Sequence, residues 1–302
     1  MLITTTEQKN IQSEILSYIP IRLRPYLTPC LSDKTEEVRL RTNRPLSVYQ
    51  NSEVYFITSS CRLSKKPYDS VLVTKDDLDA ATGLLCNRSV YAFEDEIKNG
   101  YITISGGHRV GLCGNAVIHN DTVSFINNIS GLNYRIAHEI KGCSDAVIRD
   151  IYFGGKVKNT LIISPPGCGK TTLLRDISRA ISNTGKRISI LDERGEIASM
   201  HNGVPGFEIG PLTDVLSNCP KQTGIPMLLR SMAPDVIITD ELSGDCDILA
   251  IDEAKSRGVN IIATIHGHDI PDIPDKILNC FSCLVVLSSR FGVGTVEKVM
   301  LR

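Results

Sequence analysis

A glycine-rich turn between an apolar run and a helix-like stretch is the clearest chemical signal in the sequence. Residues 160–176 read T-L-I-I-S-P-P-G-C-G-K-T-T-L-L-R-D. The spacing predicts a phosphate-binding loop, in which backbone N–H groups and a helix N-terminus face an anion. The residues expected to bind the nucleotide are Ser164, Pro165, Pro166, Gly167, Cys168, Gly169, Lys170, Thr171 and Thr172.

Two side chains of this loop have predicted roles. Lys170 is expected to reach the β- and γ-phosphates of ATP, and the Thr171 hydroxyl is expected to bind Mg²⁺. Ser164 stands where the usual motif has its first glycine, and serine fits there if its φ stays negative. Gly167 and Gly169, the glycines nearest the phosphates, are present. The alternative is a glycine-rich turn between strand and helix that binds no ligand.

A pair of acids follows another apolar run, V-I-I-T. Asp240 is predicted to hold Mg²⁺, generally through water, and Glu241 to polarise the water that attacks the γ-phosphate in line. An apolar strand that exits into a charged loop is weak evidence alone. The phosphate loop earlier in the chain makes the pair a strong indication of nucleotide hydrolysis.

Further polar residues follow two other apolar runs. Glu193 and Glu196, in the segment D-E-R-G-E, are candidates for positioning water or Mg²⁺, although a charged loop is an equal alternative. His266, with Thr264 as a second candidate, is expected to sense the γ-phosphate. Arg230 lies in the segment before Asp240, and the sequence leaves open whether it is structural or faces a nucleotide across an interface.

Positioning these residues requires a parallel sheet. From residue 160 onward, strands alternate with helices, which predicts an α/β P-loop NTPase domain over residues 141–302 with helices on both faces of a mostly parallel sheet. Ligands bind outside the carboxyl ends of such strands. An amphipathic helix is expected within residues 142–159. The predicted strands are 161–163, 188–191, 236–239, 259–263 and 284–287.

The first part of the chain, residues 1–140, predicts a smaller α+β domain. Its expected elements are a helix over 10–28 whose pattern Pro20 and Pro25 interrupt, a hairpin over 38–48, a strand at 54–57, a helix capped by Thr74, a helical piece at 91–98 and an antiparallel meander over 101–126. Arg39, Arg41, Arg109 and Arg135 lie in or beside these strands, where they could meet a partner's phosphates or acids. Solvated charges at sheet edges are the alternative for each.

Composition limits the function classes. The 302 residues include 33 basic and 34 acidic ones, so the net charge of -1 argues against a protein that coats nucleic acid. Ten scattered cysteines and an N-terminus without a signal-peptide pattern favour the reducing cytosol. No apolar run approaches the ~20 residues that span a bilayer. Membrane association would therefore depend on a partner or a surface.

The motifs together carry a family resemblance. The segments S-P-P-G-C-G-K-T-T-L-L-R-D-I, I-L-D-E-R-G-E-I-A, L-L-R-S-M-A-P-D-V-I-I-T-D-E and A-T-I-H-G resemble the stage III sporulation protein AA family, which is related to the hexameric secretion ATPases. The segments E-E-V-R-L-R-T-N-R-P-L and N-G-Y-I-T-I-S-G-G-H-R-V-G-L-C-G are also similar. The resemblance covers nearly the whole chain.

The resemblance implies a RecA-like, Mg²⁺-dependent ATPase that assembles as a homo-oligomer, a ring of six. Its partners would be membrane channel proteins of a secretion-like sporulation complex. Its place would be cytoplasmic and peripheral to the membrane, on the mother-cell side of the forespore membrane. The matching motifs imply that three residues belong to functional sequence motifs of the secretion ATPases: Glu193, Glu196 and His266. Arg109 and Arg135 would be the first candidates for closing the nucleotide site from another subunit.

Three other functions compete with this interpretation. A nucleic-acid motor would need a basic channel or stacking aromatics, and the sequence has 5% aromatic residues and no tryptophan. A nucleotide-binding scaffold without turnover would make Glu241 a surface charge. A small-molecule kinase would need a basic lid, and no arginine-rich insertion follows the second or third strand. We therefore expect no direct nucleic-acid partner.

Overall fold

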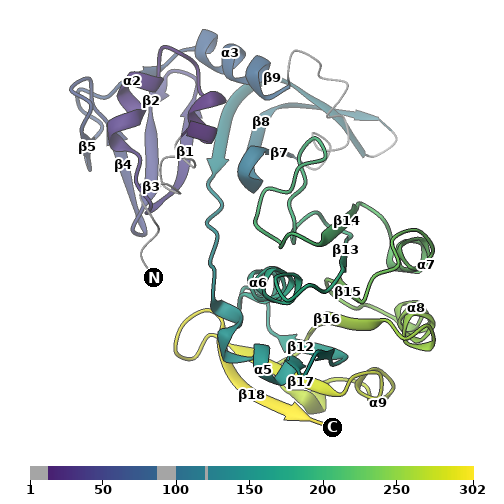
Figure 1. Cartoon of the computed structure of the whole chain (residues 1–302). Coiled ribbons are helices and arrows are strands. Elements are labelled where there is room, and N and C mark those ends of the chain that lie inside the picture. Colours follow the sequence, from purple (N-terminus) through teal and green to yellow (C-terminus); the bar gives the residue numbers. More distant parts are fainter. Residues whose placement is uncertain (1–12, 87–99, 120–121) are drawn as a thin grey trace. The chain divides into compact units, whose positions relative to one another are not determined.

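The computed structural model describes residues 13–86, 100–119 and 122–302 (Figure 1). The chain divides into two compact units. Unit 1 comprises residues 1–138 with 201–206, and unit 2 comprises residues 139–200 with 207–302. The helical piece predicted at 91–98 lies outside the described residues.

Unit 1 is built on a seven-stranded antiparallel sheet in the order β5-β4-β3-β1-β9-β8-β7. The predicted hairpin, now β1 with β3, and the predicted meander β7-β8-β9 are confirmed. A second sheet pairs β2 with β6. The strands are β1 Thr35–Arg41, β2 Arg44–Pro45, β3 Ser47–Gln50, β4 Glu53–Ile57, β5 Leu63–Ser64, β6 Leu72–Val73, β7 Tyr101–Ile104, β8 His108–His119 and β9 Thr122–Arg135.

The helices of unit 1 are short, apart from α3, Lys75–Leu85. Thr74 caps α3 as predicted, because its hydroxyl accepts from the Asp77 N–H while the Asp77 carboxylate accepts from the Thr74 N–H. The helical pattern over 10–28, which Pro20 and Pro25 interrupt, is broken into two helices in its described part. Residues 13–17 are helical, the chain then turns around Pro20, which cannot donate a backbone hydrogen bond, and a helix resumes as α2. The remaining helices are α2 Arg24–Leu27, η1 Thr28–Cys30 and η3 Ser105–Gly107.

Unit 2 contains the predicted parallel sheet, in the order β14-β13-β15-β16-β12-β17-β18. All neighbouring pairs are parallel except β17 with β18. The strands predicted from sequence are confirmed as β12 Thr160–Ser164, β13 Ile188–Asp192, β15 Val236–Thr239, β16 Asn260–His266 and β17 Cys283–Ser288. The prediction missed the two edge strands, β14 Thr213–Ser217 and β18 Thr295–Leu301, because both mix polar with apolar residues and stay partly exposed.

Helices cover both faces of this sheet, as predicted (Figure 1). Alternate residues of β12 separate the two layers, since Ile162 packs in the core with α6 while Leu161 and Ile163 pack in the core with α7 and α8. Burial on both faces explains the continuous apolar strands that the sequence shows. The helices are α5 Ile148–Ile151, α6 Lys170–Ser182, α7 Lys221–Ser231, α8 Asp245–Ser256 and α9 Asp275–Leu278, with η4 Cys143–Ala146 and η5 Ile270–Asp272.

The helix predicted within 142–159 is confirmed only as a short one, α5. After η4 and α5, the chain forms a hairpin of β10, Tyr152–Phe153, with β11, Lys156–Val157. Gly154 and Gly155, which the sequence pattern suggested as a helix stop, have φ values of 59° and 79°. They make the hairpin turn, for which two successive left-handed residues are suited. No helix in the described part of the chain is long and apolar enough to cross a membrane.

Candidate functional site

The predicted phosphate loop, which spans residues 164–170, joins β12 to α6 at the carboxyl edge of the parallel sheet. Gly167 and Gly169 have φ values of 72° and 83°, in the left-handed region that glycine adopts without strain. Ser164 ends β12 and does not have a positive φ, so serine fits at the place where the usual motif has glycine. Its hydroxyl donates to the Pro165 carbonyl at 2.9 Å. The loop thus leads directly into the N-terminus of α6, whose first backbone N–H groups have no partner within the helix and can bind an anion.

Lys170 is the first residue of α6, and its side chain folds over the loop. Its Nζ donates to the carbonyls of Ser164 at 3.3 Å and Pro165 at 3.4 Å, and lies 3.1 Å from His266 Nδ1. Burial lowers the pKa of Lys170, and the carboxylate of Glu241 opposes that change. The ammonium is held in place by weak, exchangeable partners, which a phosphate could replace.

Glu241 lies beside this lysine and is held from two sides. Its Oε2 accepts from Arg194 Nη1 at 2.8 Å, and its Oε1 is 2.9 Å from His266 Nε2. His266 thus bridges Lys170 and Glu241. The neutral tautomer with its hydrogen on Nε2 serves both contacts, because it accepts from the lysine at Nδ1 and donates to the carboxylate. Arg194 therefore binds a carboxylate of its own chain.

Asp240 lies one residue before Glu241 and is 8% exposed. Neither of its oxygens has a hydrogen-bond partner of good geometry among the residues that the structure describes, although the Lys221 ammonium is 3.3 Å from Oδ1. Burial raises the pKa of Asp240, and the positive charge of Lys221 opposes this. A buried carboxylate with unused oxygens is costly, and it is the type of group that a hydrated cation would satisfy.

Glu193 and Glu196 come from the loop after β13. Lys221, which is 3% exposed, donates to Glu193 and so joins that carboxylate to Asp240. Asp192 has a structural role, because its buried carboxylate accepts from the N–H groups of Glu196, Ile197 and Ala198 at 2.8–3.1 Å. Of the predicted pair, therefore, the structure links Glu193 to Asp240, while Glu196 is exposed.

Four other predicted residues make none of the side-chain contacts described above. Thr264 is 2% exposed and sits inside β16, which is longer than predicted and ends at His266. Arg230 is exposed in the last turn of α7, at the opposite end of that helix from Lys221. Arg109 and Arg135 belong to unit 1, where they face each other across β8 and β9. The cluster described above is built from unit 2 alone.

Lys221 is the residue that sequence reasoning missed. It opens α7 directly after Pro220, and the preceding strand, β14, was not predicted. The rule that residues after parallel strands gather at one edge would have found it, because β14 pairs with β13 in parallel and Lys221 follows it closely. A lysine buried between two carboxylates is uncommon enough to indicate a specific role.

Comparison with known proteins identifies the family. The family model described as "Sporulation stage III, protein AA" matches residues 8–300. The chain belongs to the stage III sporulation protein AA family. Its similarity to the Bacillus subtilis (strain 168) stage III sporulation protein AA is 37% identity over 277 residues, covering 87% of this chain and 86% of the relative. The resemblance inferred from the motifs is thereby confirmed.

Other proteins share part of this sequence or its fold. The Arabidopsis thaliana protein SEEDLING PLASTID DEVELOPMENT 1 is 31% identical over 204 residues, covering 67% of this chain and 27% of the relative. The Legionella pneumophila ATPase DotB has a TM-score of 0.55 at 15% identity, covering 89% of this chain and 76% of DotB. The pilus retraction motor PilT with bound ADP has a TM-score of 0.53 at 14% identity, covering 83% of this chain and 74% of PilT. These structures share the RecA-like α/β fold predicted from sequence.

Proposed function

We propose that this protein hydrolyses ATP at the phosphate loop of unit 2. One observation carries the proposal. The Lys170 ammonium, the Glu241 carboxylate and the unsatisfied Asp240 carboxylate gather at one edge of the parallel sheet, beside a loop whose glycines are left-handed. This combination supplies a cradle for phosphates, a site for a cation and a base for water within one cluster.

The proposed roles follow from these contacts. Lys170 exchanges its carbonyl partners for the β- and γ-phosphates. Thr171 and Asp240 would hold Mg²⁺, which would supply positive charge to neutralise the phosphates. Glu241 orients the attacking water and accepts its proton, while Arg194 and His266 fix the direction of its carboxylate.

The remaining predicted residues have supporting roles in this proposal. Glu193 stays joined to Asp240 through Lys221, Glu196 remains a candidate for positioning water, and Thr264 remains the second candidate, after His266, for sensing the γ-phosphate. Ser164, Pro165, Pro166, Gly167, Cys168, Gly169 and Thr172 would complete the cradle. Arg109, Arg135 and Arg230 are proposed as candidates to complete the site of a second copy.

At the level of the assembly, we propose a homo-oligomeric motor, a ring of six, that powers assembly of or transport through a secretion-like channel during sporulation. It would work in the cytoplasm, peripheral to the membrane, with the channel proteins as partners. Family membership and the fold shared with the ATPase DotB and the pilus retraction motor PilT support this proposal.

Substitution of the proposed base tests the chemistry. Glu241→Gln should bind ATP but release phosphate about a hundredfold more slowly, because the amide cannot accept the proton of the water. Nucleotide binding is measured with a fluorescent ATP analogue and turnover by phosphate release. Glu253→Gln is the matched control, since the Glu253 carboxylate pairs with Arg257 at the end of α8. Unchanged turnover in the Glu241 variant would remove Glu241 as the base.

The oligomer is tested separately. Specific ATPase activity should rise with protein concentration as light scattering shows the chain associating, because a residue from a second copy would complete each site. A monomer with full activity at every concentration would refute the ring while leaving the hydrolysis proposal intact.

A further inference from the structure

A basic groove lies at the amino edge of the parallel sheet, opposite the edge that carries the phosphate loop. It consists of two adjoining hollows of about 630 and 590 Å³ that share Lys156, Val157 and Asn260. Arg187 precedes β13, Asp235 precedes β15, and Asn260 begins β16, which places the groove where the parallel strands start. The nucleotide chemistry proposed above uses none of its residues.

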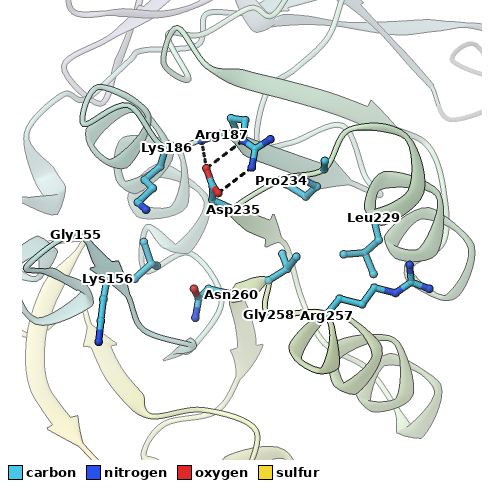
Figure 2. Close-up of a pocket in the computed structure, with 13 residues that line it drawn as sticks. Gly155, Lys156, Lys186, Arg187, Leu229, Pro234, Asp235, Arg257, Gly258 and Asn260 are labelled. Carbon is cyan, nitrogen blue, oxygen red and sulfur yellow. Dashed lines mark hydrogen bonds and ion pairs between the residues drawn. The ribbon is translucent and has the colours of Figure 1, made fainter.

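Figure 2 shows the first hollow. Lys156 and Lys186 lie on one side, Leu229 and Arg257 on the other, and Asn260 lies between them. The wall is therefore mixed, with cationic side chains facing apolar surface. A ligand that carries both negative charge and apolar groups matches such a wall.

The charges of this hollow are unequally committed. Arg187 pairs with Asp235, with Nη2 and Oδ1 3.1 Å apart, and Arg257 pairs with Glu253 at 2.8 Å. Lys156 and Lys186 form no hydrogen bond or ion pair through their ammonium groups with any residue in the described ranges. The lysines are thus the cations left for a ligand.

The second hollow adds charge of the same sign. Arg149 and Lys158 line it together with Asp150, and neither cation has an ion pair within the part of the chain that the structure describes. Phe153 and Leu301, which are 77% and 52% exposed, supply apolar surface beside them. The second hollow therefore combines uncommitted cations with exposed apolar side chains.

Two of the basic residues in the groove are explained by their place after the C-termini of helices. Lys186 and Arg257 follow the C-termini of α6 and α8, where the helix dipole favours cations. Lys156 and Lys158 come from the β10-β11 hairpin and the residues after it, so the helices do not account for them. These two lysines carry the inference.

We propose that the basic groove binds an extended acidic segment of a partner protein. Carboxylates of the segment would meet Lys156, Lys158 and Lys186, and its apolar side chains would contact the exposed Phe153 and Leu301. The arginines of the first hollow are already engaged and no helix N-terminus opens there, so that hollow offers neither an unpaired guanidinium nor a helix end for a phosphate. A flat membrane would meet only the rim of a concave groove.

The test measures binding of a fluorescein-labelled peptide of about eight residues, in which Glu alternates with Leu, to the full chain. Binding should weaken with added salt, because the attraction is between charges near the surface. The peptide with Gln in place of Glu should bind at least about tenfold more weakly. The double variant Lys156→Glu with Lys158→Glu should lose affinity for the acidic peptide by a similar factor.

Matched variants keep the result interpretable. The control, Lys66→Glu with Lys298→Glu, makes the same charge change at exposed lysines outside the groove lining and should bind within about twofold of the unmodified chain. Lys156→Gln with Lys158→Gln repeats the test without added negative charge, should the reversal unfold the protein. Equal affinity in all variants would overturn the proposal. So would binding of inorganic triphosphate or of vesicles with anionic lipid that depends on these lysines while the acidic peptide fails to bind.

Discussion

Asp176 and Asp240 are buried aspartates of unit 2 that differ in how many hydrogen bonds their carboxylates accept. Asp176 is 2% exposed and accepts from the Ser144 N–H at 2.8 Å, the Ser144 hydroxyl at 2.7 Å and Arg179 Nε at 2.8 Å. Asp240 is 8% exposed and has only the Lys221 ammonium, 3.3 Å away and poorly oriented, among the described residues. One carboxylate is satisfied by the fold and the other is not.

The pKa directions express the same difference. Burial raises the pKa of a carboxyl in both places. For Asp176, hydrogen bonds from Ser144 and Arg179 outweigh burial and lower the pKa. For Asp240, burial outweighs the attraction of Lys221 and the pKa is raised. A buried acid that the chain satisfies holds the fold together, whereas one left unsatisfied stores a cost that a ligand can relieve.

The largest expected effect is on turnover at Asp240. Asp240→Asn should slow phosphate release about a thousandfold, because the neutral amide no longer attracts Mg²⁺. The free energy of unfolding should change by no more than about 1 kcal/mol, since Lys221 keeps Glu193 as a partner and the charge that is removed lacks well-oriented hydrogen bonds. Phosphate-release assays and urea unfolding check both parts. Strong destabilisation with intact turnover of the folded fraction would mean that Asp240 is a structural acid like Asp176.

Lys221→Met is expected to give the next effect, on stability. Removing the lysine leaves the Glu193 and Asp240 carboxylates without their shared cation, and loss of one partner from a buried pair costs about 3 kcal/mol. Urea unfolding measures this loss. Lys221→Arg is the control that keeps the charge and should recover most of the stability. If the Met variant is as stable as the unmodified chain, the lysine does not hold the two acids together.

Much of the fold could be predicted because its signals are local. Apolar runs marked the central strands of unit 2, and the glycine and lysine spacing marked the phosphate loop. The edge strands β14 and β18 escaped because their residues face solvent on one side, and the Gly154-Gly155 turn was mistaken for a helix end because glycine serves both purposes. Composition alone does not separate these cases.

The candidate site was predictable where its residues follow recognised strands. Asp240, Glu241 and His266 were found in this way, and their roles stay predictions. Lys221 was missed because only tertiary structure brings the start of α7 to these acids. The structural use of Asp192 was also invisible, since its partners are backbone N–H groups arranged by the loop itself.

Asp176→Asn should destabilise unit 2 by about 2 kcal/mol, because the amide nitrogen cannot accept from Ser144 or Arg179. Turnover per folded molecule should stay within about threefold, since neither Ser144 nor Arg179 belongs to the phosphate loop. Urea unfolding and phosphate release measure the two quantities. Loss of turnover without loss of stability would place Asp176 among the acids that serve the ligand and would break the contrast with Asp240.

The smallest expected effect is the pH dependence of the stability lost in Asp176→Asn. A carboxyl whose pKa is lowered on folding contributes stability that is complete above its unfolded pKa, about 3.9, and is lost as the pH falls through the lower folded value. The stability gap between the unmodified chain and Asp176→Asn should therefore be full at neutral pH and narrow below about pH 4. Urea unfolding at a series of pH values measures the gap. A gap that stays constant through the acidic range would assign the loss to packing and would separate burial of Asp176 from its charge.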